Sequence, residues 1–391
     1  MKQQLVFVAS LIVIVLTRCT LFSPPEGKGT PPPPLQEAAG GTPTPVPTLE
    51  AEPAWLEPQA RLALIFKRPS PLGGQDLYRL SPDGRPPVRL LNLQDELFRA
   101  SASPDGKFLA IHTRPREGAK RDKLFLLSLS DLSLDLVTQD TWITTMAWAP
   151  SGSALTFSQW TDGSVQIVSY DLTAHRLRTL FEWRGSGPWD IVGWVLDDGK
   201  LLLSHLAGGG LLIDQLDLLD VQTAEVKTVY TDSTKLTSIV SVAPGGRVAL
   251  VGQLRSTTDP RVRLQRLDLT NNRLTPLMEP EDANALVASV PVWSPTGKRV
   301  AFTVSSSFGK GAQGVDRIVI LDVESGEVST VVEFANPSPL AFPLAWLSEE
   351  VLLVSNLSEE STEVLYSIRT DGTGMQRILD LSGGRWLTVS P

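Results

Sequence analysis

The sequence predicts an all-β protein built from a repeated unit of four short strands, and three observations predict it. From about residue 60 onward the chain lacks long 3.6-residue periodicity and instead shows short runs rich in Val, Leu, Ile and Thr. Gly, Asp, Pro and Ser separate these runs. A turn motif, Ser103-Pro104-Asp105-Gly106-Lys107 in its best copy, recurs about every 48 residues, which is typical of a β-propeller.

The first element along the chain is an export signal. Residues 1–18 contain no acidic side chain, and Lys2 precedes an apolar-to-small run from Leu5 to Leu16. As a helix this run would rise about 18 Å, which is too short for a hydrocarbon core of about 30 Å. We therefore expect residues 1–18 to be a signal peptide. An uncleaved short anchor and a different cleavage site are the alternatives.

The only cysteine follows directly. Leu16-Thr17-Arg18-Cys19 resembles the lipobox of bacterial lipoproteins, in which the cysteine is acylated and becomes the mature N-terminus. Arg18 departs from that pattern, because the family has Gly, Ala or Ser at this position. The resemblance implies lipidation at Cys19 and an extracytoplasmic protein anchored to a membrane of the cell envelope. A single cysteine also excludes disulfides within the chain and Cys-based zinc sites.

A proline-rich segment separates the cysteine from the repeats. Eleven prolines lie between Thr20 and Ala60, four of them consecutive from Pro31 to Pro34. Such a stretch favours polyproline II structure and no packed core. At about 3.1 Å per residue it could hold a domain up to about 100 Å from its anchor. We expect residues 19–59 to be a lipid-anchored, disordered linker and residues 60–391 to be the β-propeller.

The repeated turn predicts the number of blades. Its other copies are Ala149-Pro150-Ser151-Gly152, Leu196-Asp197-Asp198-Gly199-Lys200, Ala243-Pro244-Gly245-Gly246-Arg247, Ser294-Pro295-Thr296-Gly297-Lys298 and the degraded Leu347-Ser348-Glu349-Glu350. Six intervals give six complete blades. Arg385–Pro391 is then the innermost strand of a seventh, whose outer strands are Leu62–Phe66, Gln75–Leu80 and Val88–Leu91.

We therefore predict a seven-bladed β-propeller of four-stranded antiparallel blades, with the ring closed by N- and C-terminal strands. Six or eight blades fit the spacing less well. Ala54-Trp55, with Pro58, is a rival for the first-strand motif, and it also gives seven blades.

Two further repeated positions have structural roles. Asp171, Asp220, Asp268 and Asp322 each begin a short polar stretch, where we expect the carboxylate to cap a hairpin turn between the third and fourth strands. Trp148, Trp194, Trp293 and Trp346 follow a smaller residue on each innermost strand. Since successive side chains point to opposite faces, large residues of one blade should pack on small residues of the next, in the core.

Together these motifs resemble the TolB-like propeller repeat, a relative of the WD repeat. The resemblance covers about residues 60–391, and its best copies are Ala102–Ile111, Trp148–Phe157 and Trp293–Phe302. It implies a propeller and makes a partner in the bacterial cell envelope plausible, but it carries no interaction residues over to this chain.

Composition and motifs argue against several kinds of chemistry. With 35 basic and 43 acidic residues the net charge is −8, which argues against nucleic-acid binding. The predicted starts of the innermost strands are Phe98, Thr144, Asp190, Ser238, Ser289, Phe342 and Arg385. Only Asp190 and Arg385 are charged there, with opposite signs, which is weak support for a metal site. We expect no catalytic set, no metal and no cofactor.

Aromatic residues outside the repeat suggest a binding face. Trp142, Trp183 and Trp189 fall in predicted connections between blades, and Trp160 falls between a second and a third strand. In a propeller these connections open on the same face. The candidate face comprises Trp142, Trp160, Trp183, Arg184, Trp189, Asp190, His112 and His205. Clustered Trp with Arg is typical of interfaces and of stacking sites. The alternative is that these rings merely cover the blade ends.

The sequence thus predicts a non-enzymatic binding or scaffold module, a monomer tethered to the membrane. Its loop face would recognise a protein, peptide or glycan of the cell envelope. An enzyme acting on a sugar or lactone at the channel mouth, with Asp190 as the acid, is the alternative. An accessory subunit of an exporter or a peptidase is a third possibility.

Overall fold

A computed structural model of the protein describes residues 62–390, apart from 84, 116–120, 162, 186, 197–198, 207–211, 257–258, 260, 280–285, 288, 306–314, 336–340, 358–362 and 382. The predicted signal peptide (1–18), Cys19, the linker (19–59) and the Ala54-Trp55 motif lie outside the described residues.

The fold is all-β. The described residues form 28 strands and no α-helix, and every strand pair between them is antiparallel. Within the same part of the chain no helix is long and apolar enough to cross a membrane.

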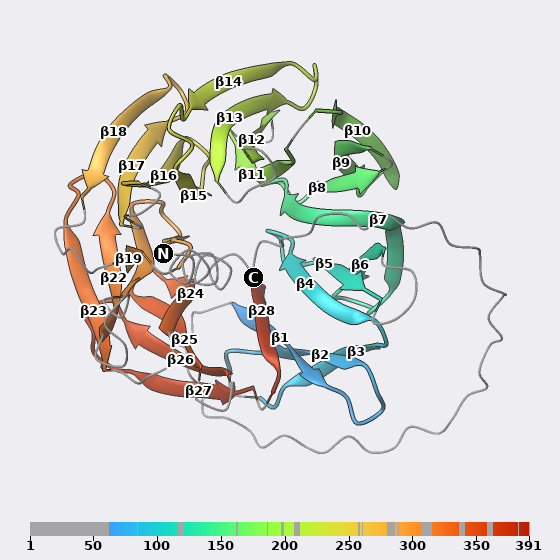
Figure 1. Ribbon diagram of the computed structural model, residues 1–391. Helices are drawn as coiled ribbons and strands as arrows, with labels where there is room; N and C mark the ends of the chain where they lie inside the picture. The colour runs from blue at the N-terminus through green and yellow to red at the C-terminus, as the bar shows by residue number, and fades with distance from the viewer. Residues whose placement is uncertain are drawn as a thin grey trace, which may run out of the picture.

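The strands fall into seven groups, which we call units 1 to 7. Each unit has four strands, except that the first strand of unit 6 is in two pieces, β19 and β20, and β7 belongs to both unit 2 and unit 3. Figure 1 shows the units arranged in chain order about a central axis, with the colour passing from blue through green and yellow to red. In each unit the first strand lies nearest the axis and the fourth lies at the rim. This antiparallel order agrees with the predicted repeat.

The strands of units 1 to 3 are β28 (Arg385–Ser390), β1 (Ala63–Pro69), β2 (Gln75–Leu80) and β3 (Val88–Leu93); β4 (Glu96–Ala102), β5 (Phe108–Arg114), β6 (Asp122–Ser128) and β7 (Leu134–Trp148); then β7 again with β8 (Ala154–Thr161), β9 (Ser164–Asp171) and β10 (Arg176–Trp183).

The strands of units 4 to 7 are β11 (Trp189–Val195), β12 (Lys200–Leu206), β13 (Ile213–Asp220) and β14 (Val226–Thr231); β15 (Thr237–Val242), β16 (Val248–Leu254), β17 (Val262–Asp268) and β18 (Arg273–Met278); β19 (Leu286–Val287), β20 (Val292–Trp293), β21 (Arg299–Ser305), β22 (Val315–Asp322) and β23 (Val328–Ala335); β24 (Ala341–Ser348), β25 (Val351–Leu357), β26 (Glu363–Arg369) and β27 (Gln376–Asp380).

The two ends of the described chain meet in unit 1. β28 pairs with β1, with Ala63 opposite Ser390 and Lys67 opposite Arg385, and the sheet runs in the order β28-β1-β2-β3. The C-terminal strand therefore completes the sheet that the first three strands begin, as the sequence predicts.

The described residues form seven hydrophobic core clusters, one between each pair of successive units. The cluster of Phe66, Tyr78, Leu353 and Leu365 joins unit 7 to unit 1, so the last unit packs on the first. Because each unit buries both faces of its sheet, strands in the middle of a unit are apolar on both sides.

The predicted packing of the repeated tryptophans is confirmed. Trp148, Trp194 and Trp346 are buried and Trp293 is half-buried, and each packs in a cluster between two units. Their indole N–H groups also donate hydrogen bonds to the preceding unit, at its small residue. The acceptors are the carbonyls of Ser101 (3.0 Å), Ala147 (3.3 Å) and Val292 (2.9 Å), and Oγ of Ser241 (2.9 Å) for Trp293.

Every unit carries a β-bulge in its rim strand, which the sequence did not predict. In each unit the register shifts by one residue on the rim strand, which leaves one apolar side chain unpaired, and β7 has a second shift at Asp140. These residues are Leu90, Val137, Leu180, Val229, Leu277, Val331 and Ile378. Most of them are buried, so the bulge turns an apolar side chain toward the core.

The turns follow the predicted chemistry. Asp322 accepts hydrogen bonds from the backbone N–H groups of Ser325 (2.8 Å) and Glu324 (3.0 Å), and Asp171, Asp220 and Asp268 bind their own turns in the same way. The bond from Ser325 helps to hold the pKa of Asp322 below its usual value. These aspartates are therefore turn caps, as predicted.

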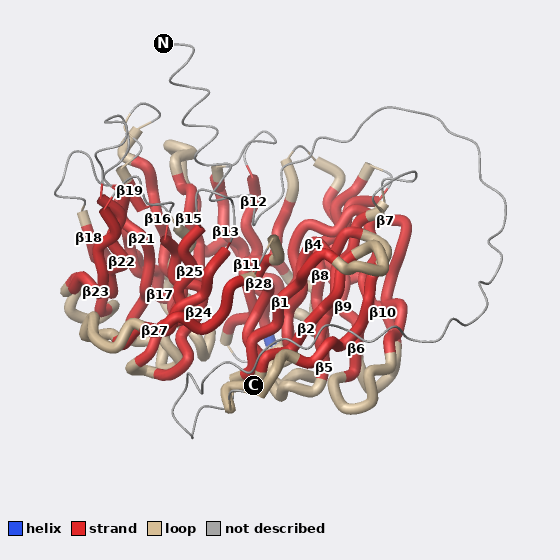
Figure 2. Tube along the Cα trace, turned by 90° about the horizontal axis from the view of Figure 1, so that it is seen from below, coloured by secondary structure: helices blue, strands red, loops and turns tan. Residues whose placement is uncertain are grey.

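Figure 2, a side view, shows that the strands run between two ends of the molecule. At one end the innermost strands begin, the second strands finish and the third strands begin. We call this end the loop face. The capped turns between third and fourth strands lie at the opposite end.

Candidate functional site

The predicted binding residues lie at the loop-face ends of units 2 to 4, all of them in strands except Arg184, which directly follows β10. Trp142 lies inside β7, Trp160 near the end of β8, Trp183 at the end of β10 and Trp189 at the start of β11. The prediction that three tryptophans occupy connections between units is wrong. For Trp142 the reason is that residues 134–148 contain no Gly or Pro, so β7 continues from the rim of unit 2 into the innermost strand of unit 3. Trp183 and Trp189 are the strand residues that flank the connection between β10 and β11.

The first group of site residues surrounds Asp122, the first residue of β6. Its carboxylate is fully buried and lies 2.8 Å from Nε2 of His112 and 2.9 Å from Nε of Arg114. It also accepts a hydrogen bond from the backbone N–H of Ile143, 3.1 Å away at the start of the next unit. Asp122 therefore ties the end of β5 to unit 3.

The charges in this group follow from burial and partners. Burial lowers the pKa of His112, although Asp122 favours its charged form, so the imidazole is neutral at pH 7. Burial alone would raise the pKa of Asp122, but hydrogen bonds from His112 and Arg114 outweigh it, and the pKa is lowered. The group thus holds one carboxylate, one guanidinium and one neutral imidazole.

Two aromatic rings flank Arg114. Its guanidinium carbon lies 4.6 Å from the ring centroid of Phe98 and 5.6 Å from that of Trp142, and Phe98 meets His112 edge-on with centroids 5.2 Å apart. Trp142 is half-buried and lies opposite Trp160 in the β7–β8 register. Cation–π contacts of this kind fix the ring of Trp142 across the boundary between units 2 and 3.

The second group lies between units 3 and 4. Trp189 is 4% exposed, and its ring centroid lies 4.9 Å from that of His205 and 6.2 Å from that of Trp183. Nδ1 of His205 lies 2.6 Å from Oδ1 of Asp214, the second residue of β13. The indole N–H groups of Trp183 and Trp189 are buried without a hydrogen-bond partner in the described part of the chain.

The ring of Trp183 packs directly on the backbone that follows it. A side chain at Gly185 would place its Cβ 2.2 Å from Trp183, so glycine is required for this approach. Trp183 and Trp160 are both half-buried and pack against the core cluster of units 3 and 4. Arg184, in contrast, is exposed and pairs with Glu182.

Asp190 forms a third, polar group near the axis. Its Oδ1 accepts hydrogen bonds from Oγ1 of Thr144 (2.5 Å) and from Oγ of Ser158 (3.3 Å). Arg99, which donates to the carbonyl of Thr144 at 3.2 Å, is the nearest cation that acts on it. Burial raises the pKa of Asp190 in spite of these partners.

The structure therefore divides the predicted face into three groups and does not bring all eight residues together. His112 and Trp142 belong to the group around Asp122, whereas Trp183, Trp189 and His205 form the second group and Asp190 the third. Trp160 connects the first two. The rings are more buried than an exposed face requires, but Arg184 and parts of three tryptophans remain accessible.

Four residues that build these groups were not predicted as site residues. Arg114 holds Trp142, Phe98 packs on Arg114 and His112, and Asp122 and Asp214 hold the histidines. One signal could have found the aspartates. Acidic residues recur at the start of the third strand of a unit, as Asp76, Asp122, Asp214, Asp316 and Glu363.

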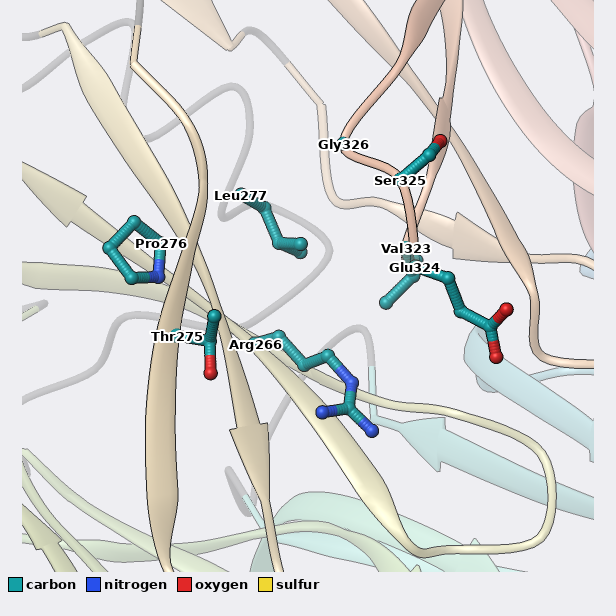
Figure 3. A pocket seen from close by; sticks show the side chains of 8 residues that line it. All are labelled: Arg266, Thr275, Pro276, Leu277, Val323, Glu324, Ser325 and Gly326. Atoms are coloured by element: carbon teal, nitrogen blue, oxygen red, sulfur yellow. The ribbon is translucent and has the colours of Figure 1, made fainter.

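Two other features bear on possible ligands. Within the described ranges no three His, Cys, Asp or Glu side chains form a group that could hold a metal ion. An open groove of about 360 Å³ lies between units 5 and 6, away from the three groups (Figure 3). It is lined by Arg266 and residues 275–277 of unit 5 and by the turn 323–326 of unit 6.

Solved structures share this fold. An oligogalacturonate lyase from Vibrio parahaemolyticus aligns over 82% of the chain and 89% of its own length, with a TM-score of 0.60 and 11% identity. A prolyl endopeptidase structure aligns over 80% of the chain and 47% of its own length, with a TM-score of 0.62 and 12% identity. At such identities the similarity concerns fold alone, and the chain has a TolB-like β-propeller fold.

TolB from Acinetobacter baumannii aligns over 69% of the chain and 62% of its own length, with a TM-score of 0.47 and 17% identity. The chain thus spans less than two thirds of the length of TolB and about half of the endopeptidase. No protein-family model and no curated protein sequence matches the chain.

Proposed function

We propose, from the premise of a TolB-like β-propeller fold, that the seven units are seven blades and that β28 closes them into a ring. Three repeated features support this. Each pair of successive units shares one core cluster, including units 7 and 1. Each rim strand carries the same bulge. The C-terminal strand β28 pairs with β1 and so supplies the innermost strand of unit 1.

We further propose that the protein is a non-enzymatic binding module whose loop face recognises a protein, peptide or glycan. One observation carries this proposal. Four tryptophans from units 3 and 4 and two histidines from units 2 and 4 lie at the same end of the strands, and Arg184 is exposed beside them. Tryptophan supplies large contact area and a stacking surface at little cost in conformational entropy, and it dominates binding hot spots.

The arrangement of these rings suits binding. Trp142 is fixed by Arg114, and Trp183 is fixed by Trp189 and by the backbone at Gly185, so both rings are held in place before a ligand arrives. A surface that is ordered in advance loses less entropy on binding. The half-buried faces of Trp142, Trp160 and Trp183 and the guanidinium of Arg184 would form the contact surface.

Site-specific photo-crosslinking tests this proposal in cells that make the protein. A photoreactive residue replacing Arg184 should give crosslinked products, because Arg184 is exposed beside Trp183 on the loop face. The same residue replacing Thr173, which is exposed in a turn at the opposite end, is the matched control. Adding Trp183→Ala should remove the products. Equal crosslinking from both positions, or none from Arg184, would contradict the proposal.

We propose that the protein acts outside the cytoplasm as a monomer, tethered to a membrane through Cys19. The signal-like run of residues 1–18, the lipobox-like Leu16-Thr17-Arg18-Cys19 and the proline-rich residues 19–59 support this. Metabolic labelling with radioactive palmitate tests it. The full chain should incorporate label and sediment with membranes, whereas Cys19→Ser should do neither. A labelled Cys19→Ser variant would overturn the assignment of the anchor.

An enzyme acting on a sugar or lactone is the second candidate, and one observation favours it. Asp190 is a carboxyl group with a raised pKa beside Thr144, Ser158 and Arg99, as a general acid requires. A lyase of oligogalacturonate is among the structures that share the fold. Incubation with oligogalacturonates and sugar lactones distinguishes the two candidates. Turnover that Asp190→Asn abolishes would establish the enzyme, and its absence favours the binding module.

A further inference from the structure

The rim half of β7 is an unpaired sheet edge. Residues 134–141 pair with β6 on one side, and the strand changes partner after Thr141 to pair with β8 through residues 142–148. No other described strand pairs with the free side of residues 134–141. Figure 1 shows this half of β7 following the rim before the strand turns toward the axis.

This edge carries an apolar stripe. Leu134 and Leu136 are 41% and 49% exposed, and they alternate along β7, so their side chains lie on one side of the strand. Leu132, in the turn just before β7, is 45% exposed. The rim strands of units 1, 3, 4 and 6 each expose a single large apolar side chain, at the start of the strand: Val88, Leu177, Val226 and Val328. The stripe is therefore a property of unit 2 and not of the repeat.

The edge also lacks the residues that normally prevent strand pairing. Rim strands discourage association with Lys, Arg or Pro, because an exposed edge is a template for another strand. The rim strands of units 1, 3, 4, 5 and 7 follow this rule with Arg89, Arg176, Lys227, Arg273 and Arg377. The rim half of β7 has no Lys, Arg or Pro.

The charges on the edge indicate what kind of strand could bind there. Asp131 and Asp135 are exposed among the leucines, and hydrogen bonds from Ser128 and Ser133 lower the pKa of Asp131 to about 2. The nearest cation on β6, Lys123, is paired with Asp95 at 2.9 Å. Asp140 is exposed on the same strand, so two copies of this edge would bring six aspartates together with no basic residue on either strand. Charge therefore disfavours a second copy as the occupant.

We propose that the start of β7, residues 134–136, binds an extended segment of another protein by strand addition, and that this segment alternates apolar and basic residues. Main-chain hydrogen bonds would extend the sheet of unit 2, Leu134 and Leu136 would cover the apolar side chains of the added strand, and Asp131 and Asp135 would attract its basic ones. This site is separate from the loop face and does not depend on the function proposed for it.

A pair of model peptides tests the proposal on the full chain. The probes are fluorescent seven-residue peptides with blocked ends, one alternating lysine with valine and the other glutamate with valine. Fluorescence anisotropy should show the lysine peptide binding at least about tenfold more tightly. Asp135→Asn should weaken its binding by about threefold and reduce its salt dependence. Equal affinity for the two peptides would overturn the proposal.

Matched variants locate the binding. Leu134→Lys with Leu136→Lys places two cations on the edge, and it should weaken binding of the lysine peptide at least about tenfold. Leu177→Lys with Val226→Lys adds the same charge at the corresponding exposed positions of units 3 and 4, and it should change binding less than about twofold. Thermal unfolding checks that both variants fold. Equal losses of peptide binding in the two variants would overturn the proposal. It would also be overturned if the unmodified protein formed a dimer that Leu134→Lys with Leu136→Lys dissociates.

Discussion

At the scale of single residues, the group around Asp122 shows how burial sets the protonation of an imidazole. The carboxylate of Asp122 is fully buried and lies against His112, which is also buried, and Arg114. Burial depresses the pKa of His112 below its ordinary value of 6.5, so the folded protein resists protonation of this imidazole more than the unfolded chain does.

Stability should therefore fall on mild acidification. The contribution of neutral His112 is complete above pH 6.5 and is lost as the pH falls below that value, by up to about 1.4 kcal/mol per pH unit. Asp122, whose pKa is also depressed, adds a further loss only below about pH 3.8. Chemical denaturation at pH 7, 6 and 5 measures the slope. We expect His112→Gln to flatten it and His175→Gln, at an exposed position, to leave it unchanged.

Two adjacent glycines allow the cost of backbone strain to be measured apart from the cost of a steric clash. Gly245 and Gly246 both have positive φ, of 83° and 65°. A Cβ at Gly245 would meet nothing within 4 Å, whereas one at Gly246 would lie 2.5 Å from Cα of Val195 in the preceding unit. Gly245→Ala should thus lower the free energy of unfolding by about 1 kcal/mol, and Gly246→Ala by about 3 kcal/mol or more. Equal losses in urea denaturation would show that the contact between units 4 and 5 is looser than described.

At the scale of elements, the tryptophans of the innermost strands connect each unit to the one before it. Packing of a large side chain on a small one is evident from the sequence, because Trp148 and Trp346 follow Ala147 and Ala345 in the repeat. The hydrogen bond from the indole N–H is not, because its acceptor depends on how far one sheet is rotated relative to the next.

A double-mutant cycle measures one of these bonds. Trp293 donates to Oγ of Ser241, so Trp293→Phe and Ser241→Ala should be coupled by about 1 kcal/mol in the free energy of unfolding. Trp148→Phe with Ser101→Ala is the control, because its acceptor is a backbone carbonyl that the second substitution keeps. Coupling near zero in the first cycle would show that the bond to Ser241 contributes nothing.

The limits of sequence reasoning are clearest in β7. Turn chemistry predicts strands and hairpins well wherever Gly, Pro or Asp marks them, as at Ser103–Lys107 and Asp322–Gly326. No such residue marks the passage from unit 2 to unit 3, and the predicted connection at Trp142 is in fact strand. The bulges could not be predicted from the sequence for a related reason, since one extra residue in a rim strand leaves the pattern of apolar residues almost unchanged.

The candidate site was predicted as a list of residues, and its grouping could not be predicted. His112 and Asp122 are ten positions apart and meet across two paired strands, while Thr144 and Asp190 meet between units. Such contacts depend on strand register and on packing between sheets. Burial of Trp189 by Trp183 and His205 depends on them as well.

At the scale of the whole molecule, the pairing of β28 with β1 joins the two ends of the described chain. Leu64 and Phe66 on β1 are fully buried, and they lie opposite Val389 and Trp386 of β28. Removal of residues 385–391 would uncover these side chains and leave β1 with a free edge.

We therefore expect deletion of residues 385–391 to abolish a single cooperative thermal transition and to cause aggregation in size-exclusion chromatography. Deletion of residues 1–59 is the control, and it should shift the midpoint of unfolding by less than about 2 °C, because these residues precede the propeller that the sequence predicts. A C-terminal deletion that melts like the full chain would show that unit 1 is stable without its innermost strand.

The same pairing has a consequence for biosynthesis. More than 300 residues separate β1 from β28, and the chain is synthesised from its N-terminus. At a synthesis rate of 5–20 residues per second, roughly 15 to 60 seconds pass between the synthesis of β1 and that of β28. Throughout that interval the first sheet lacks its innermost strand, so a nascent chain of this protein needs a holding chaperone, or delivery across a membrane before folding begins.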